Sequence, residues 1–168
     1  MTNEQMTNEP LEVVVGQLLL HSHLTLVTAE SCTGGLIGHR ITDVPGSSEY
    51  FVGGVVAYSY DAKEKLLDVH HDTLYDHGAV SAETAVEMAR GARRALGADI
   101  GISATGIAGP GGGLPGKPVG LVYICLSARG FDRTEHYIWN KDRAGNKFDS
   151  AEAALIMLKE YLESQPAV

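Results

Sequence analysis

The apolar positions of the chain recur with two different spacings, which separate expected helices from expected strands. From Leu11 to Leu19 they fall three and four residues apart, the spacing of a helix with one buried face. Short apolar runs at 24–27, 52–58 and 99–104 predict strands, and stretches at 36–41, 61–67 and 82–96 predict helices between them. The clearest helix is the one expected after Ser81, a typical N-cap, and before Gly97, a typical C-terminal stop.

The last third of the chain has a different pattern. Apolar segments at 121–126 and 136–139 flank a turn around Gly130, which predicts an antiparallel hairpin. The final helix is expected to run to about residue 162 and to turn inward Ala151, Ala154, Leu155, Leu158 and Leu162. Helices between the early strands and a late hairpin predict an α/β fold, a three-layer α/β/α sandwich with a mixed sheet. We expect one domain over 10–168, preceded by a disordered extension at 1–9.

The amino-acid composition and the net charge argue against several classes of function. The 168 residues are 44% hydrophobic and 20% charged, which is typical of a soluble globular protein. A formal net charge of −8 argues against nucleic acid as a partner. No apolar run approaches the roughly 20 residues that cross a membrane, and the first ten residues lack the pattern of a signal peptide. With only Cys32 and Cys125 no disulfide framework is implied, so a cytoplasmic protein is expected.

The segment Thr28–Gly35 places a hydroxyl and a thiol where an expected strand turns into a helix. Unpaired N–H groups at a helix N-terminus can stabilise an oxyanion, so Ser31 is a candidate nucleophile, with donors from Thr33, Gly34 and Gly35. The simpler alternative is that Ser31 or Thr33 only caps the helix. Cys32 is an alternative nucleophile, because helix N-termini depress the pKa of a thiol.

A second candidate segment, Tyr58–Lys63, lies between an expected strand and the next helix. Lys63 could act as general base for Ser31 if its pKa fell from about 10.4 towards 7–8. Tyr58 could orient the lysine or relay its proton, and Tyr60 could stack on a flat ligand. The alternatives are a solvated lysine and tyrosines that pack on the strand.

A glycine-rich segment from Thr105 to Gly113 follows the third expected strand. Its backbone could bind a phosphate near Thr105, Gly106 and Gly109, although it matches neither a P-loop nor a dinucleotide fingerprint. A flexible loop is the alternative. Arg143 could pair with the same phosphate, its default role being a surface salt bridge. His70, His71 and His77 lack the spacing of metal ligands, so no metal site is expected.

Six ordered segments carry a resemblance to a known family. They are 29–35 (AESCTGG), 45–48 (PGSS), Tyr58–Ser59 with Lys63, 77–81 (HGAVS), 105–110 (TGIAGP) and 117–120 (KPVG). In this order and spacing the chain resembles the C-terminal domain family of the competence/damage-inducible protein CinA. The resemblance covers nearly the whole chain after about residue 10.

The resemblance implies nicotinamide mononucleotide (NMN) amidase activity, which releases ammonia and leaves nicotinic acid mononucleotide. It implies a Ser–Lys arrangement on Ser31 and Lys63, with Tyr58 alongside and no cofactor. The family often has Asn where this chain has Tyr60. This difference affects the contacts with a ligand and leaves the Ser31–Lys63 pair unchanged. A non-catalytic nucleotide-binding or regulatory domain is the alternative, because the glycine-rich loop would serve it equally well.

The late hairpin also bears on assembly. Its apolar residues include Val122, Ile124, Ile138 and Trp139, and an exposed apolar sheet edge is often covered by self-association. We therefore expect a homo-oligomer, most simply a dimer. The alternative is that the terminal helix covers these side chains within one subunit.

Overall fold

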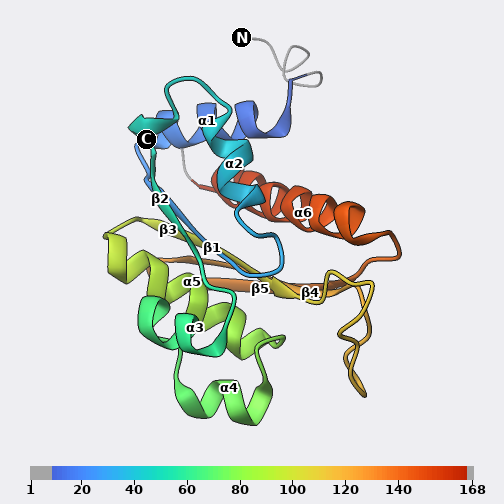
Figure 1. Cartoon of the computed structure of the whole chain (residues 1–168). Helices are drawn as coiled ribbons and strands as arrows, with labels where there is room; N and C mark the ends of the chain where they lie inside the picture. Colours follow the sequence, from blue (N-terminus) through green and yellow to red (C-terminus); the bar gives the residue numbers. More distant parts are fainter. Residues whose placement is uncertain (1–8, 166–168) are drawn as a thin grey trace.

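A five-stranded mixed sheet separates two layers of helices (Figure 1). The computed structural model describes residues 9–165, so the extension expected at 1–9 lies outside the described residues except for Glu9. The strand order is β2-β1-β3-β4-β5. The three parallel strands are β1 (Leu26–Glu30), β2 (Phe51–Val56) and β3 (Ile100–Gly106). The antiparallel hairpin consists of β4 (Leu121–Ala128) and β5 (Phe131–Ile138), which confirms the mixed sheet with a late hairpin.

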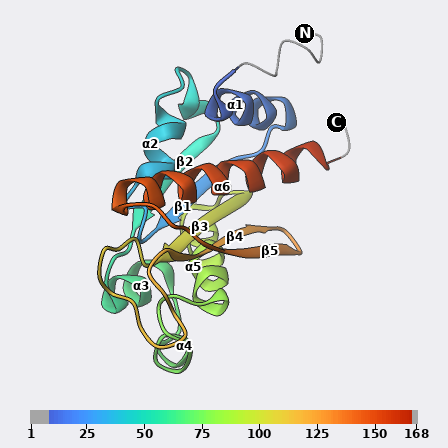
Figure 2. The ribbon, with the colours of Figure 1, turned by 90° about the vertical axis from the view of Figure 1, so that its right-hand side faces the viewer.

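Helices lie on both sides of the sheet (Figure 1). One layer holds α1 (Leu11–Ser22), α2 (Leu36–Thr42) and α6 (Arg143–Glu163), and Figure 2 shows α6 crossing the strands of the sheet. The other layer holds α3 (Tyr60–Leu67), α4 (His71–His77) and α5 (Ala82–Leu96). A 3-10 turn, η2 (Ser47–Glu49), leads into β2. The three-layer sandwich predicted from the apolar pattern is confirmed.

The two long helices match their predicted buried faces closely. All five residues expected to face inward from α6 are buried. The α5 helix begins after Ser81, whose hydroxyl accepts a hydrogen bond from the Thr84 N–H, and ends at Gly97 in a left-handed conformation. The apolar spacing of this helix predicts an inner face that includes Ala85, Ala89, Ala92 and Leu96. The three alanines are buried, but Leu96 is 40% exposed, so its assignment to that face is wrong.

The structure differs from the prediction at several boundaries and in one helix. Strand β1 extends to Glu30, because Thr28 and Glu30 are enclosed in the structure although their polarity suggested a turn. Strand β3 includes Thr105 and Gly106, which were expected in the loop. The α4 helix was not predicted, since Leu74 is its one fully buried side chain and no apolar period marks it.

The terminal helix covers one face of β4, the inner strand of the hairpin, within one chain. Val122 and Ile124 are buried against α6, and the Trp139 indole N–H donates to the Ser150 hydroxyl at 2.9 Å. Ile138 remains 61% exposed. Among residues 9–165, no helix has the length and apolar character needed to cross a membrane.

Candidate active site

The residues of the two candidate segments meet at the carboxyl ends of the three parallel strands. Ser31 follows β1 directly, and its N–H donates to the Ala104 carbonyl of β3 at 2.9 Å. The Glu30 carbonyl accepts the Ala57 N–H, just beyond β2, also at 2.9 Å. Both neighbouring strands therefore hold the turn in place, at the edge of the sheet where α/β proteins commonly bind ligands.

The structure brings Lys63 and Ser31 together. Lys63 lies in the first turn of α3, and its Nζ is 2.9 Å from Ser31 Oγ and 2.7 Å from the Ala57 carbonyl oxygen. The lysine is 1% exposed, and among the described residues no carboxylate lies within 4 Å of it. Burial lowers the pKa of Lys63 to about 8. The interpretation of this lysine as a solvated helix residue is wrong.

This geometry suits proton transfer between the two side chains. With a pKa near 8, about one lysine in ten is neutral at pH 7, compared with fewer than one in a thousand at its ordinary pKa. A neutral amine can accept the proton of the neighbouring hydroxyl, which is what makes a serine nucleophilic. Ser31 is itself largely buried, with 8% of its surface exposed.

The neighbouring thiol has the opposite character to the one expected. Cys32 is 4% exposed, and burial raises its pKa to about 12. The helix N-terminus does not depress this pKa, because the desolvation of a thiolate outweighs the favourable field. Cys32 is therefore a packed core residue and a poor nucleophile.

Glu30 organises the turn, a role that sequence reasoning missed. Its carboxylate accepts hydrogen bonds from the Thr33 hydroxyl (2.7 Å) and from three backbone N–H groups, those of Gly35 (3.1 Å), Ile37 (3.0 Å) and Gly38 (2.8 Å). The N-cap of α2 is Gly35, which has no side chain to satisfy these donors. Glu30 supplies that cap from the end of β1. The sequence did contain a signal for this capping role: a glutamate that lies a few residues before the glycine at the start of a helix.

These bonds determine which backbone donors are left in the turn. The Gly34 N–H donates to the Ser31 carbonyl at 3.0 Å, and the Gly35 N–H belongs to the Glu30 cap. Within residues 9–165, the N–H groups of Cys32 and Thr33 have no acceptor. Of the three expected donors only the Thr33 N–H is left, and the Cys32 N–H joins it as a candidate donor to an oxyanion.

Arg143 joins three segments at the rim of the site. Its guanidinium donates to the Gly109 carbonyl at 2.7 Å and to the Tyr58 hydroxyl at 2.9 Å. Among the described residues no carboxylate lies within 4 Å of Arg143, so the default salt bridge is absent. Tyr58 is 61% exposed and contacts Arg143, with no hydrogen bond to Lys63.

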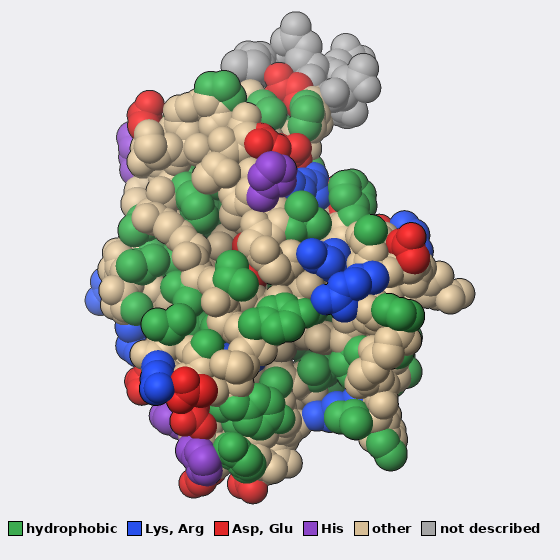
Figure 3. Space-filling model, in the orientation of Figure 1, with side chains coloured by type: hydrophobic (Ala, Val, Ile, Leu, Met, Phe, Trp, Pro, Cys, Tyr) green, Lys and Arg blue, Asp and Glu red, His purple; other side chains and the backbone are tan. Residues whose placement is uncertain are grey.

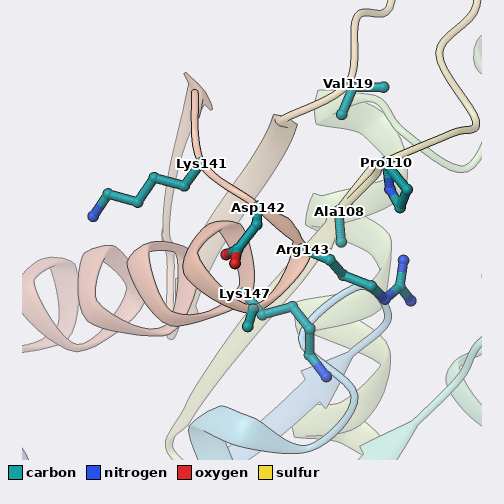
Figure 4. Close-up of a pocket in the computed structure, with 8 residues that line it drawn as sticks. Ala108, Pro110, Val119, Lys141, Asp142, Arg143 and Lys147 are labelled. Carbon is teal, nitrogen blue, oxygen red and sulfur yellow. The ribbon is translucent and has the colours of Figure 1, made fainter.

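A cavity of about 530 Å³ opens beside Arg143, at the start of α6. It is lined by Ala108, Pro110, Val119, Lys141, Asp142, Arg143, Ala144 and Lys147. Figure 4 shows Arg143 and Lys147 extending toward the same side, whereas Lys141 points away and pairs with Asp149 at 2.8 Å. Figure 3 shows Lys and Arg side chains gathered beside the start of this helix.

Lys147 is a second candidate that sequence reasoning missed. A Cβ built on Gly34 would lie 3.5 Å from Lys147 Nζ, which places this ammonium beside the Ser31 turn. No carboxylate of the described residues lies within 4 Å of it. Its position four residues after Arg143, on the same face of a helix, was the available signal.

The other predicted site residues belong to the frame around the site. The Tyr60 hydroxyl accepts the Ala79 N–H at 3.3 Å, and its ring packs edge-on against Tyr75. The Thr105 hydroxyl donates to the Ala79 carbonyl at 2.7 Å, and Gly106 pairs with Val122 in the sheet. Of the glycine-rich loop, Ala108 and Pro110 line the cavity, and Gly109 between them is held by Arg143.

No three side chains of His, Cys, Asp or Glu within residues 9–165 are grouped so that they could hold a metal ion.

Comparison with known proteins places this site in a family. Residues 8–162 match the family model described as the CinA C-terminal domain. The chain belongs to the CinA C-terminal domain family. A CinA-like protein of Chlorobaculum tepidum is 52% identical over 159 residues, which are 89% of this chain and 38% of that protein. A CinA-like protein of Chloroherpeton thalassium is 51% identical over 164 residues, 94% of this chain and 39% of that protein.

The chain thus spans about two fifths of the length of these CinA-like relatives. The solved structures of the family match it over nearly their full length. A competence damage-inducible protein A of Klebsiella pneumoniae has a TM-score of 0.90 at 34% identity, covering 93% of this chain and 97% of that one. The competence/damage inducible protein CihA of Agrobacterium tumefaciens has a TM-score of 0.82 at 38% identity, covering 92% and 96%.

Proposed function

We propose that this CinA-family domain is a serine amidohydrolase that converts NMN to nicotinic acid mononucleotide and ammonia. The observation that carries the proposal is the 2.9 Å contact between Lys63 Nζ and Ser31 Oγ, made by a buried lysine whose pKa is lowered to about 8. A pair of this kind needs no metal to generate a nucleophile. The choice of NMN as substrate rests on the family resemblance.

In the first half of the reaction, Ser31 Oγ attacks the carboxamide carbon while Lys63 Nζ takes the hydroxyl proton. The Cys32 and Thr33 N–H groups donate to the oxyanion that forms. When the intermediate collapses, the carbon–nitrogen bond breaks, Lys63 returns its proton to the nitrogen, and ammonia leaves. The product is an ester between Ser31 and the nicotinate group.

The second half of the reaction hydrolyses this ester. Lys63, neutral again, takes a proton from water as the water oxygen attacks the ester carbon. The carbon–oxygen bond to Ser31 then breaks, and Lys63 returns the proton to Ser31 Oγ. Nicotinic acid mononucleotide leaves and the starting enzyme is restored.

The cationic rim fits the phosphate of a mononucleotide. Arg143 and Lys147 extend to one side of the cavity, and neither has a carboxylate partner among the described residues, so both can pair with a dianion. The exposed ring of Tyr58 could contact the cationic pyridinium, an interaction worth roughly 0.5–2 kcal/mol. NMN should therefore be preferred over its riboside and over free nicotinamide.

The test is ammonia release from NMN by the purified protein. Ser31→Ala and Lys63→Ala should each reduce turnover by about 10³-fold or more, and the double variant little further, because the two side chains act as a unit. Cys32→Ala should stay near wild type. Saturable NMN binding without ammonia release would instead favour the non-catalytic nucleotide-binding domain.

The same assay tests the phosphate contact. Lys147→Gln should raise KM for NMN by roughly tenfold, in line with the loss of one charged contact. Lys141→Gln is the matched control: Lys141 also lines the cavity, but its ammonium pairs with Asp149 and extends away from Arg143 and Lys147, so KM should stay unchanged. Equal rates on NMN, its riboside and nicotinamide would contradict the phosphate contact while leaving the amidase chemistry intact.

A further inference from the structure

A second hollow, of about 380 Å³, lies between α5 and the tip of the hairpin. We refer to it as the arginine pocket, and its lining residues are Arg90, Arg93, Arg94, Ser127, Ala128, Gly130, Phe131 and Asp132. Three arginines within five residues of one helix form its basic wall. In a chain with a net charge of −8, this is a marked local excess of positive charge.

The arginine pocket lies at the opposite end of the sheet from Ser31. In the β3–β4 pairing, Ser127 is opposite Gly101, whereas Val122 at the other end is opposite Gly106 beside the candidate active site. Five residue steps along a strand correspond to roughly 16 Å. The pocket is therefore separate from the Ser31 site, and nothing in the proposed amidase chemistry uses it.

Two of the three arginines pair with a carboxylate, whereas the third, Arg93, does not. Asp132 is bound by Arg90, which donates to it from Nε at 2.9 Å and from Nη2. Arg94 approaches Asp68 at 3.3 Å, a pair in which both side chains are mostly exposed and therefore well screened. Among the described residues, no carboxylate lies within 4 Å of Arg93.

Two buried polar atoms in the pocket wall also lack a partner. Arg93 Nη1 and Ser127 Oγ are both shielded from solvent, and neither has a hydrogen-bond partner among the described residues. Ser127 is 1% exposed. Ser127 lies opposite Asp132 in the β4–β5 pairing, and its hydroxyl helps to lower the pKa of that carboxyl. Buried donors are nearly always satisfied in folded proteins, so Arg93 Nη1 indicates an acceptor that the chain does not provide.

We propose that the arginine pocket binds a phosphate-type oxyanion. Arg93 Nη1 and Ser127 Oγ would donate to its oxygens, and Arg94 would add charge from the rim. A guanidinium with a hydroxyl beside it is a combination suited to phosphate. The Asp132 carboxylate lines the same pocket, and its pairing with Arg90 offsets part of its negative charge. Phe131 is 43% exposed in the same wall and offers an apolar surface to whatever group the phosphate carries.

The test is a titration of the full chain with inorganic phosphate at constant ionic strength, followed by backbone amide NMR. We expect saturable shifts at residues 90–94 and 127–132. Arg93→Gln should weaken this binding at least tenfold and Ser127→Ala at least threefold. Lys147→Gln is the matched control and should leave these shifts unchanged. The Ser127→Ala result stands alone if Arg93→Gln does not fold.

Other outcomes overturn the proposal. Phosphate shifts confined to the Ser31 region and abolished by Lys147→Gln would mean that the active-site cavity alone takes the ion. Shifts that chloride reproduces, or that never saturate, would mean screening without a site. Neither result bears on the amidase, whose assay measures ammonia.

A second titration identifies the source of the phosphate group. Phenyl phosphate should bind more tightly than inorganic phosphate, and Phe131→Ala should remove that gain, if the ligand is an aromatic phosphomonoester. Equal binding of both, unaffected by Phe131→Ala, would identify the free ion as the ligand.

Discussion

At the scale of single residues, the candidate active site depends on a lysine that is kept out of water. Burial is the main cause of the lowered pKa of Lys63, since no second cation is needed to explain it. The same burial raises the pKa of Cys32 to about 12. One apolar environment therefore activates the amine and inactivates the thiol, which explains why the hydroxyl between them is the nucleophile we propose.

The pKa of Lys63 predicts how activity depends on pH. Only the neutral amine can accept the Ser31 proton, so kcat/KM for NMN should rise about tenfold per pH unit below pH 8 and level off above it. Initial rates of ammonia release between pH 6 and 9.5 measure this directly. A rate that falls over this range as pH rises would contradict the assignment of Lys63 as base.

At the scale of elements, the turn between β1 and α2 is held by one carboxylate. Glu30 receives four hydrogen bonds, and three of them come from backbone donors that have no other partner at this helix end. Glu30 therefore holds Ser31 and the N–H groups of Cys32 and Thr33 in position. Glu30 itself is 1% exposed and does not line the cavity.

Replacement of Glu30 should affect both stability and activity. Glu30→Ala leaves several buried donors unpaired, so the free energy of unfolding should fall by about 3 kcal/mol or more. The turnover of NMN should fall as well, because the turn loses its anchor. Glu49→Ala, which removes an exposed glutamate from the neighbouring 3-10 turn, is the matched control. Urea unfolding that is unchanged by Glu30→Ala would show that the cap is dispensable.

The elements that could be predicted from the sequence are those whose local signals agree with their packing. The α5 helix has a cap at Ser81, a stop at Gly97 and a regular apolar face, and all three are present in the structure. The α4 helix has no such period, because it contacts the core mainly through Leu74. Strand β1 ends later than expected, because the partners that satisfy Glu30 lie up to eight residues further along the chain.

The same distinction holds for the candidate site, where residues whose type suggests chemistry were predicted and residues that act through contacts were not. Ser31 and Lys63 were identified because their residue types suggest chemistry, and the family resemblance paired them. Glu30 and Lys147 were missed because their importance lies in contacts made after folding, at a helix start and across two elements. Two of the three expected oxyanion donors are unavailable for the same reason, since the Gly34 N–H binds the Ser31 carbonyl and the Gly35 N–H binds Glu30.

At the scale of the whole molecule, the two edges of the sheet differ in chemistry. The hairpin edge, β5, carries charged residues that include Asp132, Arg133 and Glu135, a pattern that discourages pairing with another strand. The β2 edge has the sequence FVGGVV, with no charged residue, and Val52 and Val56 are 46% and 51% exposed. Both edges are open, and β2 is the one whose uncharged, apolar sequence favours pairing with another strand.

We propose that the chain forms a homodimer and that the contact uses β2 instead of the hairpin. Light scattering at micromolar concentration should then give about twice the 17.9 kDa of one chain. Val52→Lys should shift the mass to that of a monomer, because a lysine on an edge strand opposes strand pairing. Ile138→Lys, a similar change on the hairpin edge, should leave the dimer intact. A dimer lost only with Ile138→Lys would return the interface to the hairpin, and a wild-type monomer across a tenfold dilution would exclude both.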